Sequence, residues 1–476
     1  MQRWQLTTGL AAGAVLAAVF VPSIFSSMPQ VVQQPAPVPQ PVDAPVPHTG
    51  PTATTPGPGT VTVGHLTMTT SLDMSAQLLG STEERFVVID LDAAELAGSA
   101  RLPVHLAVVM DNSGSMDGKG KITHARQAAA ELARQLGPED TLSLVTFSDH
   151  ATTLIAHGGA SQQARMQALI KGIDPGGGTN LYDGLTEGQR LLSNLDREGV
   201  KRVVLLSDGM ANLGVTDPGQ LTQIAGSLVQ DGVSVSGLGL GLDYNEDLLA
   251  AMSDAGGGSY HFVDQPGQLS TLFGTELAQM SALVGRQVAV DVSLGDGVEL
   301  VEVYGYDAAL TKDGYRVFLG DLYGGSQRKI VARVKIDASS PGALDAATAS
   351  LSLADPDTST LLSGAAIAGL AVTADTQQVN ASVNAEAGTA AATAAAAKLM
   401  EQSARALDAG DREESVARLA EGSTMLRQLS TRYDAPALEA VAEEFSETQD
   451  QFATAAGRDG QYQVKRAKER ARAYSH

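Results

Sequence analysis

Short apolar runs alternate with helical patterns between residues 101 and 285. Runs rich in β-branched residues predict strands, and they are HLAVVMD, TLSLVTFS, RVVLLSDG, VSVSGLGLG and SYHFVD. Amphipathic stretches such as ITHARQAAAELARQL lie between them and predict helices. Because parallel strands need crossover connections, this alternation predicts an α/β domain with a doubly wound, mostly parallel sheet and helices on both faces.

The segments on either side of that domain have a different period. Residues 60–100 and 286–375 alternate apolar and polar positions with period two, which is typical of antiparallel strands. Neither segment has enough strands to bury its own apolar face, so we expect the two to form one β-sandwich into which residues 101–285 are inserted.

Residues 376–476 are predicted to be a C-terminal α-helical region, alanine-rich from about residue 385. A turn at Ala409-Gly410-Asp411 predicts an antiparallel helix pair. The spacing of Val416, Leu419, Leu426 and Leu429 is that of a helix stripe facing a core.

The N-terminal residues predict export. Residues 1–28 carry an early cation, Arg3, and then an apolar stretch from about Leu10 to Phe25, which is the pattern of a signal peptide or of an N-terminal membrane anchor. Residues 29–59 are proline-rich and are expected to be a disordered linker. The expected location is the cell envelope, periplasmic or extracellular, with cleavage or retention of the apolar segment left open.

Composition narrows the classes of partner. A formal net charge of -22 opposes nucleic-acid binding, because phosphates would be repelled over most of the surface. The chain has no cysteine, which excludes disulfides, thiolate metal sites and a thiol nucleophile. An acidic surface of this kind attracts cations.

Oxygen-bearing side chains follow the predicted strands at one edge of the sheet. They are Asp111, Ser113 and Ser115 in DNSGSMDGKGK, Thr179 in PGGGTNLYDG and Asp208 in LLSDG. Ligands of open α/β sheets bind outside the carboxyl ends of the strands, where these loops meet. Hard oxygen ligands with only two carboxylates predict a site for a small divalent cation, Mg²⁺ with Mn²⁺ or Ca²⁺ as alternatives. Nearby Asp117, Asp149 and Asp183 are expected to be turn or surface carboxylates, and His261 a strand residue rather than a ligand.

This pattern resembles the von Willebrand factor type A domain with its metal-ion-dependent adhesion site. DNSGS stands where the family has DxSxS, with Thr179 and Asp208 at the lone threonine and the DG aspartate. The resemblance implies that Ser113, Ser115 and Thr179 contact the metal, that Asp111 and Asp208 hold water or metal, and that an acidic residue of a partner completes the shell. The flanking strands and helices resemble bacterial relatives of the inter-alpha-trypsin inhibitor heavy chain and of calcium-activated chloride channel regulators. The protease motif HExxH of the latter is missing from this sequence.

Two classes of function follow. The first is an exported or envelope-anchored binding protein, without enzymatic activity, that grips an exposed Asp or Glu of a protein partner through Mg²⁺. The second is a Mg²⁺-dependent hydrolase that acts through Asp111. The loop has no histidine or second acidic residue placed as a base, and DNSGS departs from the DxDxT signature of aspartyl phosphatases. Binding is therefore the favoured hypothesis.

Overall fold

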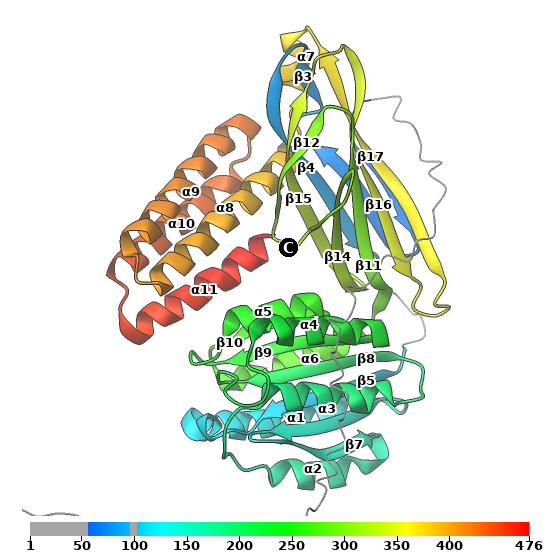
Figure 1. Ribbon diagram of the computed structural model, residues 1–476, viewed down its shortest axis with the longest axis vertical. Coiled ribbons are helices and arrows are strands. Elements are labelled where there is room, and N and C mark those ends of the chain that lie inside the picture. The colour runs from blue at the N-terminus through cyan, green and yellow to red at the C-terminus, as the bar shows by residue number, and fades with distance from the viewer. Residues whose placement is uncertain (1–55, 96–101, 476) are drawn as a thin grey trace, which may run out of the picture. The chain divides into compact units, whose positions relative to one another are not determined.

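The computed structural model describes residues 56–95 and 102–475, which form a β-sandwich, an α/β domain and a group of C-terminal helices (Figure 1). The predicted export segment, and the proline-rich linker up to residue 55, lie outside the described residues. Within the described ranges, no helix is both long and apolar enough to cross a membrane.

The α/β domain is built on one six-stranded sheet. Its strands, in spatial order, are β10 (Gly257–Val263), β9 (Val233–Leu240), β8 (Val200–Ser207), β5 (Val104–Asp111), β6 (Thr141–Phe147) and β7 (Ala151–Gly158). The pairs from β10 to β6 are parallel, and β7 pairs antiparallel with β6. The fold class predicted from the sequence is confirmed. Strand β7 was not predicted, because its burial is irregular and an edge strand lacks a continuous apolar run.

Helices cover both faces of this sheet. Alternate residues of β5 point to opposite sides, so Leu106 and Val108 pack against one set of helices and Ala107 and Val109 against another. The first set is α1 (Lys121–Gln135), α2 (Gln163–Lys171) and α6 (Leu269–Met280). The second set is α3 (Leu181–Ser193), α4 (Pro218–Leu228) and α5 (Glu246–Ala255). Strand β5 is buried on both faces, which explains its unbroken apolar run.

Strands from before and after the α/β domain share both sheets of the sandwich. The first sheet has the order β1 (Gly59–Val63), β2 (Leu66–Leu72), β4 (Thr82–Ala93), β15 (Gln327–Asp337) and β12 (Val298–Tyr304). The second has the order β13 (Ala309–Leu310), β14 (Gly314–Tyr323), β11 (Leu283–Leu294), β16 (Gly342–Ala354), β17 (Leu361–Thr373) and β3 (Ala76–Leu78). Strand β15 pairs with β4 over its whole length, and apolar side chains of both sheets form one core.

The C-terminal helices form a core of their own. They are α7 (Thr376–Ala381), α8 (Ala385–Asp408), α9 (Arg412–Tyr433), α10 (Ala437–Thr454) and α11 (Gly457–Ser475). Helices α8 and α9 are joined at residues 409–411, as the sequence predicts, and Leu419 and Leu426 are fully buried in their core. Small side chains at the start of α8, Ala387, Ala391 and Ala394, pack against the first sandwich sheet.

Candidate metal site

Three loops at the carboxyl ends of β5 and β8 bring the five predicted side chains together. Asp111 is the last residue of β5, and the segment after it forms a short 3₁₀ helix, Gly114–Gly120. Asp208 directly follows β8. Thr179 precedes α3, whose N-cap Asn180 accepts a hydrogen bond from the backbone N–H of Asp183. Both aspartates, Ser113 and Thr179 are buried, whereas Ser115 is exposed.

A chain of hydrogen bonds connects four of these residues. The Asp111 Oδ1 atom accepts from the backbone N–H of Ser113 at 2.8 Å. The hydroxyl oxygens of Ser113 and Ser115 lie 3.0 Å apart, and Ser115 donates to Asp208 Oδ1 at 2.7 Å. The second oxygen of Asp111 accepts from the hydroxyl of Ser207 at 2.7 Å. The two carboxylates are thereby held on either side of the serine hydroxyls.

Thr179 joins this cluster through the packing of its loop. A Cβ placed on Gly209 would lie 3.3 Å from Thr179 Oγ1 and 3.6 Å from Ser115 Oγ, so both hydroxyls border the backbone next to Asp208. Asn212 Oδ1 accepts from the Thr179 N–H at 2.8 Å. The Gly114 N–H donates to the carbonyl of Gly177 at 3.1 Å, which ties the first loop to the second.

Burial makes the cluster electrostatically costly without a cation. The pKa of Asp111 is raised to about 6, mainly by burial and in part by the neighbouring charge of Asp208, and hydrogen bonds from Ser113 and Ser207 limit the rise. Asp208 is compensated by Lys121, whose buried Nζ lies 2.5 Å from Asp208 Oδ2. Asp111 has no ion-pair partner among the described residues.

The donor set fits a hard divalent cation. Within residues 56–95 and 102–475, no three His, Asp or Glu side chains gather closely enough to hold a metal by themselves. The cluster instead offers two carboxylates and three hydroxyls, all oxygen donors of the kind that Mg²⁺ and Mn²⁺ bind together with water. When bound, the ion would supply positive charge and open coordination positions at the exposed edge of the sheet.

A cavity of about 630 Å³ adjoins the cluster. Ser115 and Lys121 line it on the cluster side, and Arg458 and Tyr462 at the start of α11 form the opposite wall. The end of β9, the residues after β9 and β10, and two further residues of the first loop complete the lining, namely Leu240, Gly241, Leu242, Asp243, Asp264, Gln265, Pro266, Gly118 and Lys119. On another side of the cluster, Met210 and Leu213 are exposed apolar side chains of the loop after β8.

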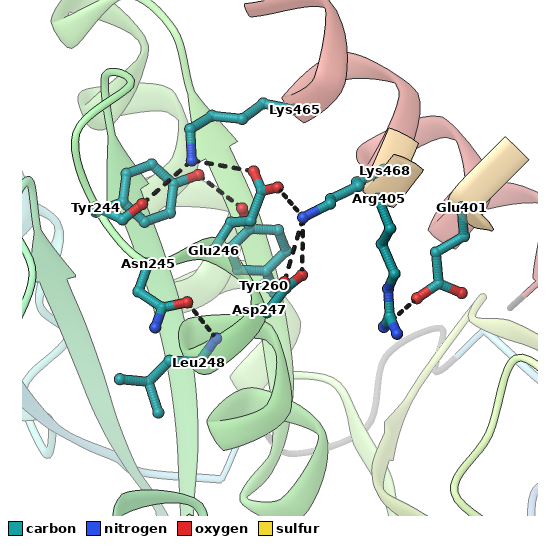
Figure 2. Close-up of polar contacts among 10 residues, drawn as sticks. All are labelled: Tyr244, Asn245, Glu246, Asp247, Leu248, Tyr260, Glu401, Arg405, Lys465 and Lys468. Carbon is teal, nitrogen blue, oxygen red and sulfur yellow. Dashed lines mark hydrogen bonds and ion pairs between the residues drawn. The ribbon is translucent and has the colours of Figure 1, made fainter. Parts of the chain in front are cut away.

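Helix α11 is fastened to the loop that lines this cavity. Figure 2 shows Lys465 and Lys468 of α11 reaching toward the start of α5, where Asn245 caps the helix. Lys465 Nζ donates to the carbonyl of Tyr244 at 3.2 Å and to Glu246 Oε2 at 3.0 Å, and Lys468 Nζ lies 2.6 Å from Glu246 Oε1. Since residues 241–243 line the cavity directly before this anchor, α11 helps to fix the cavity wall.

Residues outside the predicted five complete the site, and sequence reasoning missed them. Ser207 precedes Asp208 in LLSDG, and Lys121 ends the stretch DNSGSMDGKGK. The sequence does not tell whether a hydroxyl or an ammonium group next to a motif points into the site, so neither residue could be assigned from sequence. Asn212 lies beyond the motif and had no signal at all.

The neighbouring carboxylates behave as turn and surface residues, as predicted. Asp149 accepts from the Gly178 N–H at 2.7 Å, Asp183 accepts from the Ala151 N–H at 2.8 Å, and Asp117 is exposed. His261 is a strand residue, as predicted, but it makes a polar contact, with Nε2 3.3 Å from the buried Glu276 Oε1.

The fold and the loop cluster define the class of the α/β domain. Residues 106–211 match the family model of the von Willebrand factor type A domain. The chain thus contains a von Willebrand factor type A domain, inserted in the β-sandwich. Members of this family commonly bind partners, including proteins, through a metal-ion-dependent adhesion site that holds a divalent metal.

Two relatives and one solved structure resemble the chain. The uncharacterized protein YfbK of Escherichia coli (strain K12) is 26% identical over 197 residues, which cover 41% of this chain and 34% of YfbK. Inter-alpha-trypsin inhibitor heavy chain H4 of Homo sapiens is 29% identical over 170 residues, 34% of this chain and 18% of that protein. The match therefore spans well under two thirds of either relative.

The structural likeness extends beyond the α/β domain. A structure described as von Willebrand factor type A from Catenulispora acidiphila aligns with a TM-score of 0.65 at 18% identity and covers 84% of this chain and 90% of that chain. At this identity the likeness concerns the fold alone.

Proposed function

We propose that this protein is a non-enzymatic binding protein that holds an exposed Asp or Glu of a protein partner through Mg²⁺ or Mn²⁺ at Asp111, Ser113, Ser115, Thr179 and Asp208. The observation that carries the proposal is the convergence of these five oxygen-bearing side chains, from three loops, at the carboxyl edge of the sheet. Ser115 is exposed while the aspartates are buried, so the ion would face solvent from the hydroxyl side. A partner carboxylate is the anionic oxygen ligand that such an ion accepts.

The surroundings favour a polypeptide as the partner. The cavity of about 630 Å³ continues from Ser115 to α11 and has room for residues that neighbour a metal-bound side chain. Met210 and Leu213 offer apolar contact area beside the cluster. The chain's net charge of -22 opposes a nucleic-acid partner.

The geometry gives little support to the hydrolase alternative. Asp111 is fully buried, and both of its oxygens accept hydrogen bonds, from Ser113 and Ser207. A nucleophile needs an oxygen that is open to the substrate, and a general base needs to lie within hydrogen-bond reach. No histidine lies within hydrogen-bond distance of the described cluster, and Lys121 is committed to Asp208.

Calorimetric titration with Mg²⁺ and Mn²⁺ tests the metal site directly. We expect one site in the wild type and none in Asp111→Ala or Thr179→Ala. Asp117→Ala is the matched control, because Asp117 is an exposed carboxylate of the same loop outside the cluster. A wild type that binds neither ion would contradict the proposal.

Affinity capture from envelope fractions, run with Mg²⁺ and with chelator, tests the partner. We expect a bound protein that is released by chelator and is not captured by Thr179→Ala. A Mg²⁺-dependent phosphatase activity that is lost in Asp111→Ala would favour the hydrolase alternative instead.

We further propose that the protein is exported, because residues 1–28 have the pattern of an export segment followed by a proline-rich stretch. A C-terminal fusion to alkaline phosphatase should be active in a bacterial host, since that reporter needs an oxidising compartment. An abundant but inactive fusion would contradict export.

A further inference from the structure

Lys121 places a buried positive charge against the metal cluster. It is the first residue of α1, only 8% of it is exposed, and its Nζ lies 2.5 Å from Asp208 Oδ2. The other oxygen of Asp208 remains directed at Ser115. Gly241 lies against the lysine, since a Cβ at this glycine would be in van der Waals contact with Lys121 Cε, at 3.6 Å.

The charges of the cluster can be counted. Asp111 and Asp208 contribute two negative charges and Lys121 one positive charge, so the protein offers the metal a single net negative charge. A divalent cation reverses this to a single net positive charge. The charged side chains farther along the cavity balance one another, and they are Lys119, Arg458, Asp243 and Asp264.

We propose that Lys121 determines the ligand class of the site, by keeping the loaded centre positive so that it takes an anionic carboxylate rather than a neutral hydroxyl or carbonyl oxygen. This inference rests on the proposed metal-dependent function. Lys121 neutralises Asp208 and weakens the attraction of the site for the metal. The positive charge that remains is cancelled by one carboxylate of the partner. Because the groups are buried, solvent screens these interactions only weakly.

A purely structural role for Lys121 makes the opposite prediction. If the lysine only held Asp208 in place, removing it would loosen the cluster and weaken metal binding. If its charge opposes the metal, removing it strengthens metal binding. The direction of the change in metal affinity therefore separates the two roles.

Metal titration of the full chain is the first measurement. We expect Lys121→Met to bind Mn²⁺ and Mg²⁺ at least tenfold more tightly than the wild type, and Lys121→Arg to bind as the wild type does. Lys171→Met is the matched control, because Lys171 is an exposed lysine at the end of α2, outside the cavity, whose side chain makes no ion pair or hydrogen bond within the described residues. It should change the affinity less than twofold.

Small fluorinated probes test the ligand class. Bound Mn²⁺ should enhance the ¹⁹F relaxation of fluoroacetate in the wild type and not that of neutral fluoroacetamide. At equal Mn²⁺ occupancy, Lys121→Met should lose most of the enhancement with fluoroacetate, whereas Lys171→Met should retain it.

The outcomes separate this inference from the function on which it rests. If the wild type binds no metal, the proposed function is wrong. If the wild type binds metal but Lys121→Met binds it equally well or more weakly, the role assigned to Lys121 is wrong while the function stands. Should Lys121→Met fail to fold, Lys121→Gln removes the same charge with a polar side chain and is read by the same criteria.

Discussion

Strand β8 connects two buried polar clusters of opposite character. At its carboxyl end, the cluster of Asp111 and Asp208 holds more negative than positive charge and burial raises the pKa of Asp111 to about 6. Near its start, Arg202 is fully buried against Glu276, with their Nη1 and Oε2 atoms 2.7 Å apart. The first cluster is one positive charge short of neutrality, whereas the ion pair of the second is neutral.

The second cluster satisfies its charges with groups from several elements. Arg202 donates to Ser234 at 2.9 Å and to the hydroxyl of Tyr323 on strand β14, and Ser236 donates to Glu276 at 3.0 Å. Burial would raise the pKa of Glu276, but the Arg202 guanidinium, together with His261, outweighs this and lowers it to about 2. The difference shows how the same strand can hold a structural ion pair at one end and a deficit of positive charge, suited to a metal, at the other.

Breaking the structural pair should have the largest effect on stability. Glu276→Gln leaves Arg202 buried without a counter-ion, so we expect the free energy of unfolding to fall by about 3 kcal/mol. Urea denaturation measures this. The matched control is Glu131→Gln, which breaks an exposed ion pair with Arg134 and should leave the free energy of unfolding nearly unchanged. Equal losses of stability in the two variants would contradict the expected difference between a buried and an exposed ion pair.

Acid should weaken the same pair. The pKa of Glu276 is about 2 in the folded protein and 4.5 as its ordinary value, so its contribution to stability is present above pH 4.5 and is lost as the pH falls toward 2. The contribution is on the order of 3 kcal/mol. Unfolding measured between pH 5 and pH 2.5 should show a smaller acid-induced loss in Glu276→Gln than in the wild type. If the stability of Glu276→Gln and of the wild type falls equally with pH, a group other than Glu276 is responsible for the acid-induced loss.

Metal should stabilise only through the other cluster. At ten times its dissociation constant, Mg²⁺ should add about 1.4 kcal/mol to the free energy of unfolding. Thr179→Ala should remove this gain, whereas Glu276→Gln should keep it despite its lower baseline. Thermal melts with metal and with chelator measure the gain, and its loss in Glu276→Gln would mean that the two clusters are coupled.

The smallest expected effect concerns the contact between the α/β domain and the sandwich. Tyr323→Phe removes the hydroxyl that Arg202 contacts, and we expect a loss of about 1 kcal/mol with unchanged metal affinity. Urea denaturation and metal titration of the same variant measure both. A change in metal affinity would indicate that the sandwich influences the metal site.

The local pattern of apolar residues and turn residues was sufficient to predict much of this fold. The unbroken apolar run of β5 predicts a central strand because both of its faces are covered, and the turn at residues 409–411 predicts the α8–α9 pair because glycine there permits the positive φ that Gly410 adopts. Asp111 and Asp208 could be placed at one edge because parallel strands end on the same side of their sheet. Thr179 follows α2 and no strand, so only the packing of its loop brings it to that edge.

Other features depend on contacts between residues far apart in the sequence. Strand β7 is held at the sheet edge by its antiparallel pairing with β6, so its own pattern is weak. The cavity wall formed by α11 depends on Lys465 reaching Glu246, and no local rule relates those positions.

The sequence by itself determined the element types and the loop oxygens, because apolar periodicity and motif spacing are local properties. Only the tertiary structure decided the charge of the site, because whether Lys121 faces solvent or Asp208 depends on how α1 packs beside β8. It likewise decided that Arg202 is neutralised by Glu276 of α6 and donates a hydrogen bond to Tyr323 of the sandwich, since burial of a charge requires partners that only the folded chain brings together.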